Sequence, residues 1–262
     1  MKAVRLVGRP VLNLAFVIVM TLVLWVVLLN LADVSDLVVR YPQDVFDWLF
    51  TDPDAAENRA GVLGPLRQTL LDAGIGFVVG LSAAIALATG MVLSRGVEAA
   101  TMPVAMLVRT VPLVALAPII TLVFGNGFAT VAVMSGIVVL FPALVTIAFG
   151  LRSVTPQMQD VVKVYGGSSH DVLRRVAYPT ALPSVFAAIR ISVPGAITGA
   201  LIAEYFTTSD SVGKAVNTSL ALYQYDQLWA LVALVTIASV VLYMAAQACE
   251  GFVLARRGQS VS

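Results

Sequence analysis

The sequence predicts an all-α polytopic membrane protein with six transmembrane helices. Hydrophobic residues make up 59% of the chain and charged residues only 12%, whereas about a quarter of a soluble domain is charged. Apolar runs of about twenty residues, the length that spans a bilayer, recur along all 262 residues. The net charge of +1, with no basic patch between aromatic residues, gives no support to nucleic-acid binding.

The first span is predicted at residues 11–31, directly after a basic N-terminal segment. This apolar run is too long for a signal peptide and no clear cleavage site follows it, so we expect the span to be retained. Further spans are predicted at residues 66–93, 99–124, 128–150, 184–206 and 227–254. Glycine and alanine in the second span favour close helix packing. Pro103, Pro112 and Pro118 are expected to interrupt the third span.

Two polar segments separate the spans at either end of the chain. Residues 32–65 are polar and acidic. Within them, residues 45–50 are predicted to form a short interfacial helix, with Trp48 at the depth of the lipid headgroups. Residues 207–226, before the last span, are predicted to form a polar loop.

Basic residues predict the orientation of the spans. With the N-terminus in the cytoplasm, the inner segments contain ten of the sixteen basic residues. These are Lys2, Arg5, Arg9, Arg95, Arg152, Lys163, Arg174, Arg175, Arg256 and Arg257. Only Arg40, Arg59 and Lys214 fall in the outer loops, with Arg67 at the boundary. Because basic residues are enriched on the cytoplasmic side of membranes, we expect both termini to be cytoplasmic.

The polar segment 155–183 lies between the fourth and fifth spans and is too charged to cross a bilayer. Thr155 is a predicted N-cap, with Pro156 at the first helical position. Apolar residues at positions 158, 161, 162 and 165 then follow on one face of a short helix. Gly166-Gly167 is expected to end this helix, with a left-handed conformation at Gly166.

A second short helix is predicted directly after the glycines. Ser168 and Asp171 have the spacing of a capping box. Pro179 and Pro183 are expected to end this helix before the next span begins. Two short amphipathic helices joined at a glycine hinge, between membrane spans, indicate a docking element for another protein. His170, the only histidine, is expected on the surface of this element.

Three short motifs follow one another at a fixed spacing in this segment: Asp160-Val161-Val162, Gly166 and Val176-x-Tyr178-Pro179. In the order and spacing of these motifs, the chain resembles the permease subunits of bacterial ABC importers. Their cytoplasmic loop has Glu-Ala-Ala, glycine and Ile-x-Leu-Pro in the same register. The chain departs from that pattern with Asp for Glu, Val-Val for Ala-Ala and Tyr178 for Leu. The resemblance extends to the nitrate, sulfonate, taurine and pyrimidine-precursor permeases at residues 109–118, 124–127, 192–196 and 203–204.

The resemblance covers roughly residues 66–254 and implies the fold of a type I ABC importer permease. It divides the chain into an N-terminal span with an acidic extracytoplasmic loop (1–65), a permease core (66–254) and a cytoplasmic tail (255–262). Residues 155–179 of the core are then the coupling loop. The residues implied in coupling to the ATPase are Asp160, Gly166, Gly167, Ser168, His170, Asp171, Val176 and Pro179.

The same resemblance implies partners for this chain. They are a cytoplasmic ABC ATPase dimer that grips the coupling loops, a second permease chain, identical or different, and an extracytoplasmic binding protein. The delivered substrate would be small, such as a sulfonate, nitrate or a pyrimidine-like compound. The expected location is the bacterial inner membrane, in contact with lipid. The acidic segment 33–57 is expected on the outer face, either as a docking surface for the binding protein or as a solvated loop.

The sequence contains no phosphate-binding loop of the form G-x-x-x-x-G-K-[ST]. We therefore expect no cofactor on this chain, with ATP-Mg bound by the partner ATPase, and no catalytic residue. The single cysteine, Cys249, excludes a cysteine metal cluster and an intrachain disulfide, and no metal site is expected. Two other functions stay open: an ion-coupled secondary transporter, which needs ionisable groups near the bilayer centre, and an intramembrane enzyme, which needs a second histidine or paired carboxylates.

Four charged residues lie within the predicted spans: Asp72, Arg109, Arg190 and Glu204. The two arginines either pair with carboxylates or headgroups, or form a positive lining for an anionic substrate. Glu204 either gates the pathway or makes an interfacial salt bridge. Prolines in the third and fifth spans disturb helix hydrogen bonding, either beside a pathway or as simple packing kinks. The candidate pathway residues are Arg109, Pro112, Pro118, Arg190, Pro194, Gly195 and Glu204.

Overall fold

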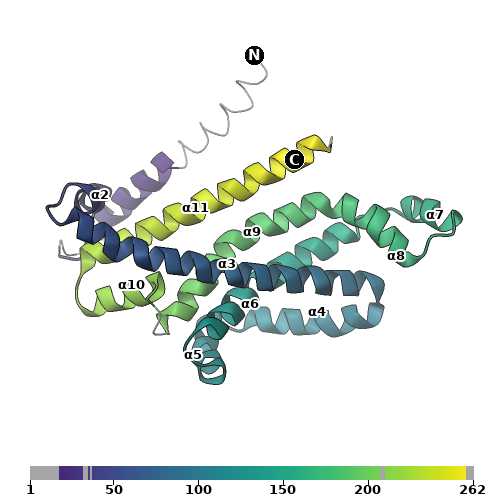
Figure 1. Cartoon of the computed structure of the whole chain (residues 1–262), viewed down its shortest axis with the longest axis horizontal. Helices are drawn as coiled ribbons and strands as arrows, with labels where there is room; N and C mark the ends of the chain where they lie inside the picture. Colours follow the sequence, from purple (N-terminus) through teal and green to yellow (C-terminus); the bar gives the residue numbers. More distant parts are fainter. Residues whose placement is uncertain (1–17, 32–34, 36, 207–209, 258–262) are drawn as a thin grey trace, which may run out of the picture.

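The described part of the protein is an elongated bundle of helices (Figure 1). The computed structural model describes residues 18–31, 35, 37–206 and 210–257, without the side chain of Arg109. Within these residues the regular secondary structure is entirely helical, which confirms the predicted all-α class.

Four helices in the described residues are long and apolar enough to cross a membrane. They are α3 (Ala55–Leu93), α6 (Phe128–Leu151), the helix Ser169–Tyr205 that ends in α9 (Tyr178–Tyr205), and α11 (Tyr225–Arg256). The bent pair of α4 (Arg95–Thr110) and α5 (Leu113–Phe124) makes a fifth if it is counted as one span. Residues 11–17 of the predicted first span lie outside the described residues, and Ile18–Leu31 is a shorter apolar helix.

The helix α3 begins at Ala55, well before the predicted start of the second span at residue 66. The polar residues of this first part of α3 are Glu57, Asn58 and Arg59, and two of them bind a neighbouring helix. The Asn58 side-chain amide donates to the Trp48 carbonyl at 2.9 Å, and Arg59 Nη1 donates to the Leu49 carbonyl at 2.7 Å. Both carbonyls lie in the last turn of α2 (Pro42–Phe50), the predicted interfacial helix. Carbonyl groups in the last turn of a helix accept no hydrogen bond from within that helix.

Of the three prolines expected to interrupt the third span, only Pro112 does so. Val111 is extended, with ψ 125°, and Pro112 is the N-cap of α5, because the residue before a proline disfavours the helical conformation. The two helices are bent by 106° at this break. Pro103 and Pro118 lie inside α4 and α5 without ending them.

The predicted polar loop before the last span contains a further helix, α10 (Val212–Ala221). Its apolar residues Val212, Ala215, Val216 and Leu220 have helical spacing, a signal that the prediction of a loop did not use. The fourth span, in contrast, was predicted to within one residue of α6.

The helix α6 lies in the middle of the bundle, between α3 and α9. A Cβ atom added at Gly76 or Gly80 of α3 would lie 2.1 Å from Ser135 Oγ or 2.6 Å from the Gly136 carbonyl oxygen of α6. One added at Gly199 of α9 would lie 2.6 Å from Ser135 Cα. Small residues therefore bring three spans into backbone contact, as is typical of membrane bundles.

The bundle has two different ends (Figure 1). At one end, which we call the α10 end, α2 and α10 pack on the outer parts of α3, α9 and α11 through an apolar cluster that includes Val45, Val212 and Leu231. At the other, the loop end, lie α7 (Pro156–Val164), α8 (Ser169–Val172) and the short π-helix Leu173–Ala177. A second apolar cluster, which includes Met91, Leu151 and Leu173, holds this end together.

Candidate functional site

The coupling loop begins with α7, whose start agrees with the predicted N-cap. The Met158 N–H donates to Thr155 Oγ1 at 3.4 Å, and Pro156 is the first helical residue. Most apolar side chains of this stretch are exposed, Val164 by 83% and the C-cap residue Tyr165 by 88%, whereas Val162 is half-buried. Such an apolar surface on an otherwise polar segment has the character of a binding surface rather than of a core-facing helix.

The two glycines reverse the chain in a Schellman motif. The Gly166 N–H donates to the Lys163 carbonyl and the Gly167 N–H to the Val162 carbonyl, both at 2.9 Å. Gly166 has φ +81°, as predicted, with open space around its Cα. Gly167 is restricted by space instead, because an added Cβ would lie 2.8 Å from the Val162 carbonyl oxygen.

The second helix of the loop begins with the predicted capping box. The Asp171 N–H donates to Ser168 Oγ at 3.3 Å, and the Ser168 N–H donates to Asp171 Oδ2 at 2.9 Å. The hydrogen bonds from the Ser168 hydroxyl and then from its backbone N–H hold the pKa of Asp171 below its ordinary value, with smaller effects of nearby charges. His170 and Asp160 are exposed on the same loop.

The second helix does not end at Pro179 or Pro183, which corrects the prediction. It continues from Ser169 to Tyr205 without a break. Residues 173–177 adopt a π-helix, in which the Tyr178 N–H donates to the Leu173 carbonyl five residues earlier. This shift in the hydrogen-bond ladder lies directly before Pro179, whose ring nitrogen has no proton to donate. Val176 and Pro179 are half-buried in this stretch.

The coupling loop also contacts the transmembrane helices beside it. The hydroxyl groups of Tyr178 and of Thr89 in α3 lie 2.5 Å apart in a hydrogen bond. On α7, Gln159 and Lys163 line a cavity of about 350 Å³ against the turn between α3 and α4. The loop is thus continuous with α9 and is bonded to α3 through the hydroxyl pair.

Arg190 of α9 forms an ion pair inside the bundle rather than a free positive lining. Its Nη1 lies 3.1 Å from Glu250 Oε2 of α11, and its guanidinium lies 6.0 Å from the Tyr243 ring centre. The side chain of Arg190 is 27% exposed and that of Glu250 7%. Glu250 was missing from the predicted charges within spans, although its position in an apolar run was a usable signal.

Glu204 is fully buried near the end of α9. Its Oε2 accepts hydrogen bonds from Thr69 Oγ1 at 2.8 Å and from the Gly213 N–H at 3.1 Å. The remaining candidates lie apart from it: Pro112 at the α4–α5 break, Pro118 inside α5, and Pro194 and Gly195 inside an unbroken α9. The side chain of Arg109 lies outside the described residues.

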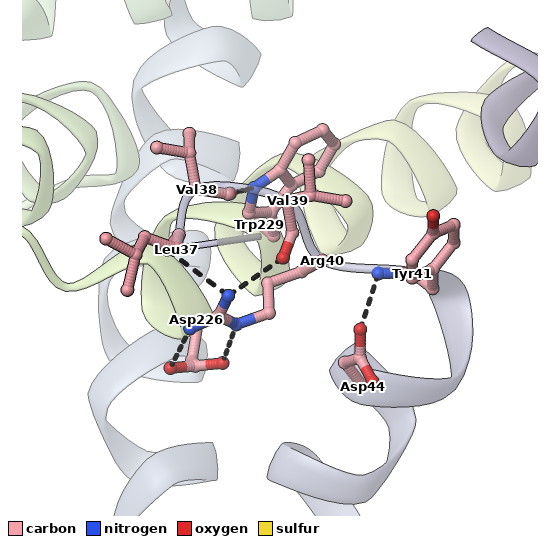
Figure 2. A network of polar contacts seen from close by, with 8 residues as sticks. All are labelled: Leu37, Val38, Val39, Arg40, Tyr41, Asp44, Asp226 and Trp229. Atoms are coloured by element: carbon pink, nitrogen blue, oxygen red, sulfur yellow. Dashed lines mark hydrogen bonds and ion pairs between the residues drawn. The ribbon is translucent and has the colours of Figure 1, made fainter. Parts of the chain in front are cut away.

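A network of polar contacts holds the segment before α2 on the start of α11 (Figure 2). Arg40 binds the Asp226 carboxylate through two nitrogens, and Trp229 Nε1 donates to the Val38 carbonyl at 2.8 Å. The hydrogen bond with Asp226 raises the pKa of Arg40 above its ordinary value. Beside it lies an open hollow of about 780 Å³ whose lining includes four carboxylates: Asp44, Asp47, Asp52 and Asp226.

Neither a metal cluster nor a disulfide is found in the described residues. No group of three or more potential metal-ligating side chains lies together there. Cys249 is free and exposed on α11. The candidate coupling residues lie in one continuous segment, from α7 to the start of α9, whereas the candidate pathway residues are spread over separate helices.

Comparison with known proteins places the chain among transport proteins. Residues 76–257 match the family model of the binding-protein-dependent transport system inner membrane component. A probable ABC transporter permease protein of Haemophilus influenzae is 29% identical over 85% of this chain and 88% of its own length. The formylaminopyrimidine transport permease protein of Halalkalibacterium halodurans is 30% identical over 56% of this chain and 59% of its own. In fold, the crystal structure of an amino acid ABC transporter with histidines matches 77% of this chain with a TM-score of 0.58 at 14% identity.

Proposed function

Because this chain belongs to the family of binding-protein-dependent transport system inner membrane components, we propose that it is the permease subunit of an ATP-driven importer whose ATPase and binding protein are separate chains. It is a multi-pass inner membrane protein with a transport role. The proposal adds that two permease chains, identical or different, form the path for a small substrate.

The observation that carries the proposal is the coupling loop. Its first helix presents exposed apolar side chains to the outside of the bundle, and its glycine turn is defined by two backbone hydrogen bonds. An amphipathic helix of this kind suits a hydrophobic groove on a partner protein. We infer that the partner is the ATPase dimer, so that the loop end is cytoplasmic and the α10 end extracytoplasmic.

The mechanism proposed is alternating access. ATP binding would close the ATPase pair and move α7, and the helix Ser169–Tyr205 would carry this movement into the bundle without a flexible joint. The Tyr178–Thr89 hydrogen bond would pass part of it to α3. Binding energy on the partner thereby becomes a shift between conformations of the permease.

The other partners are assigned by position. The acidic hollow at the α10 end would face the binding protein, where charge mainly affects the rate of association. The exposed apolar faces of α4 and α5 would meet lipid or the second permease. Pyrimidine precursors, sulfonates and nitrate are the proposed substrate classes. An ion-coupled secondary transporter is not favoured, because the family depends on binding proteins.

The proposal is tested by the binding of the ATPase encoded with this chain. Val164 is exposed, so that Val164→Asp leaves the fold of the permease intact but places a charge on the docking surface. Loss of one apolar anchor should weaken ATPase binding by about tenfold or more. Val164→Leu is the matched control, and it should retain both the ATPase and substrate uptake.

The measurements are ATPase co-purification, ATP hydrolysis and uptake in vesicles. The permease alone should hydrolyse no ATP. Equal recovery of the ATPase with Val164→Asp and Val164→Leu would contradict docking through α7. ATP turnover by a preparation free of other subunits would contradict the assignment of a transport subunit.

A further inference from the structure

The helix α10 starts with backbone N–H groups that receive their acceptors from other helices. The first N–H groups of a helix have no partner within it, and the side chain of Ser211, at the N-cap, does not cap α10. Instead, the Val212 N–H donates to Thr69 Oγ1 of α3 at 2.9 Å. The Gly213 N–H donates to Glu204 Oε2 of α9 at 3.1 Å.

The two capping side chains are joined to each other and are closed to water. Thr69 Oγ1 donates to Glu204 Oε2 at 2.8 Å, and both residues are 0% exposed. Asp72, one turn along α3, is also buried, and it accepts a hydrogen bond from Gln68 at 3.1 Å. Because water does not reach this site, a lost acceptor would leave a backbone N–H unsatisfied.

The close approach of α10 to α9 also requires a glycine at position 213. A Cβ atom there would lie 2.6 Å from both Glu204 Cβ and the Leu201 carbonyl oxygen. The start of α10 is therefore seated on the end of α9, with no room for a side chain between them. The two hydrogen bonds and this close approach together define how the start of α10 packs on α3 and α9.

We propose that Glu204 and Thr69 are positioning residues: as side chains of other helices, they cap the start of α10 and so fix it against α3 and α9. What each contributes is an acceptor oxygen at a set place. The role of this cap in transport rests on the proposed function, in which the α10 end is the outer end of the pathway. The cap itself does not depend on that function.

The test measures whether α10 is seated, by labelling single cysteines in a Cys249→Ala background. Position 219 of α10 is suitable because Ser219 is 1% exposed and cysteine has nearly the same size. Position 218 is the control because Thr218 is exposed on the same helix. With a water-soluble maleimide in opened membranes, Ser219→Cys should react slowly and Thr218→Cys rapidly.

Two pairs of substitutions then separate the cap from general packing. Glu204→Ala and Thr69→Val remove an acceptor and should speed labelling at position 219 by about tenfold, the usual scale of a lost cap. Glu204→Gln and Thr69→Ser retain an oxygen and should leave labelling slow. Labelling at position 218 should not change in any of the four variants.

Equal labelling rates at position 219 in Glu204→Ala and Glu204→Gln would overturn the proposal. If Glu204→Ala does not accumulate in membranes, the comparison of Thr69→Val with Thr69→Ser decides by the same criterion. Uptake by the assembled transporter should be lost in the two variants that label rapidly. Wild-type uptake in those variants would overturn the role of α10 in transport. Absence of uptake in the wild-type protein, with labelling as expected, would count against the proposed function alone.

Discussion

At the scale of single residues, Gly166 and Gly167 of the coupling loop are required for different physical reasons. Gly166 has φ +81° but open surroundings, so a side chain there is opposed by the backbone alone. Gly167 lies too close to the Val162 carbonyl to accept a Cβ atom. The first is a conformational requirement and the second a steric one.

We predict that Gly166→Val leaves the protein in the membrane at near-normal abundance but abolishes uptake. A β-branched residue in the left-handed region costs on the order of 1–2 kcal/mol or more, which redirects the helices of the loop without disturbing the spans. The measurements are membrane abundance, ATPase co-purification and uptake.

Gly125→Val is a matched control for this change. Gly125 has the same φ, +81°, and equally open surroundings, but it lies in the turn between α5 and α6. With ψ 176°, in a region that only glycine readily adopts, Gly125→Val should suffer at least as large a backbone strain and still retain the ATPase. Normal uptake by Gly166→Val would mean that the coupling loop is only a connector.

At the scale of elements, the ion pair between Arg190 and Glu250 fixes α11 on α9. We predict that Arg190→Gln alone destabilises the purified protein more than Arg190→Gln combined with Glu250→Gln. The single change leaves a carboxylate inside the bundle without its partner, which costs about 3–5 kcal/mol at a fully buried site and less here, because Arg190 is partly exposed. Thermal unfolding in detergent measures both.

Glu250→Gln alone completes this double-mutant cycle. If the two residues act independently, the effects of the single changes will add up to that of the double change. Additive effects would therefore contradict a structural role for the pair.

At the scale of the whole molecule, the distribution of basic residues predicts the orientation in the membrane. We predict that, in a Cys249→Ala background, Asp54→Cys reacts with an impermeant thiol reagent only from outside the cell and Ser169→Cys only from inside. Both positions are exposed; Asp54 is the N-cap of α3, and Ser169 begins α8, which lies at the loop end of the bundle (Figure 1). Labelling of Ser169→Cys in intact cells would reverse the orientation that the basic residues predict.

Much of the fold could be predicted because its signals are local. Hydropathy located α6 to within one residue, and the caps and glycines of residues 155–171 were all placed correctly. Each depends on residues within one or two helical turns of each other, so that the sequence alone contains the whole interaction.

What the sequence by itself determined about this protein is therefore its class, most of its spans and the construction of its coupling loop up to Asp171. Only the tertiary structure decided three other features: the capping of α10, the unbroken path through Pro179, and the partner of Arg190. The reason is physical. The Val212 N–H is capped by a residue 143 positions away, and Arg190 pairs with an acid on another span. Such partners meet only when the helices pack, and no local pattern contains them.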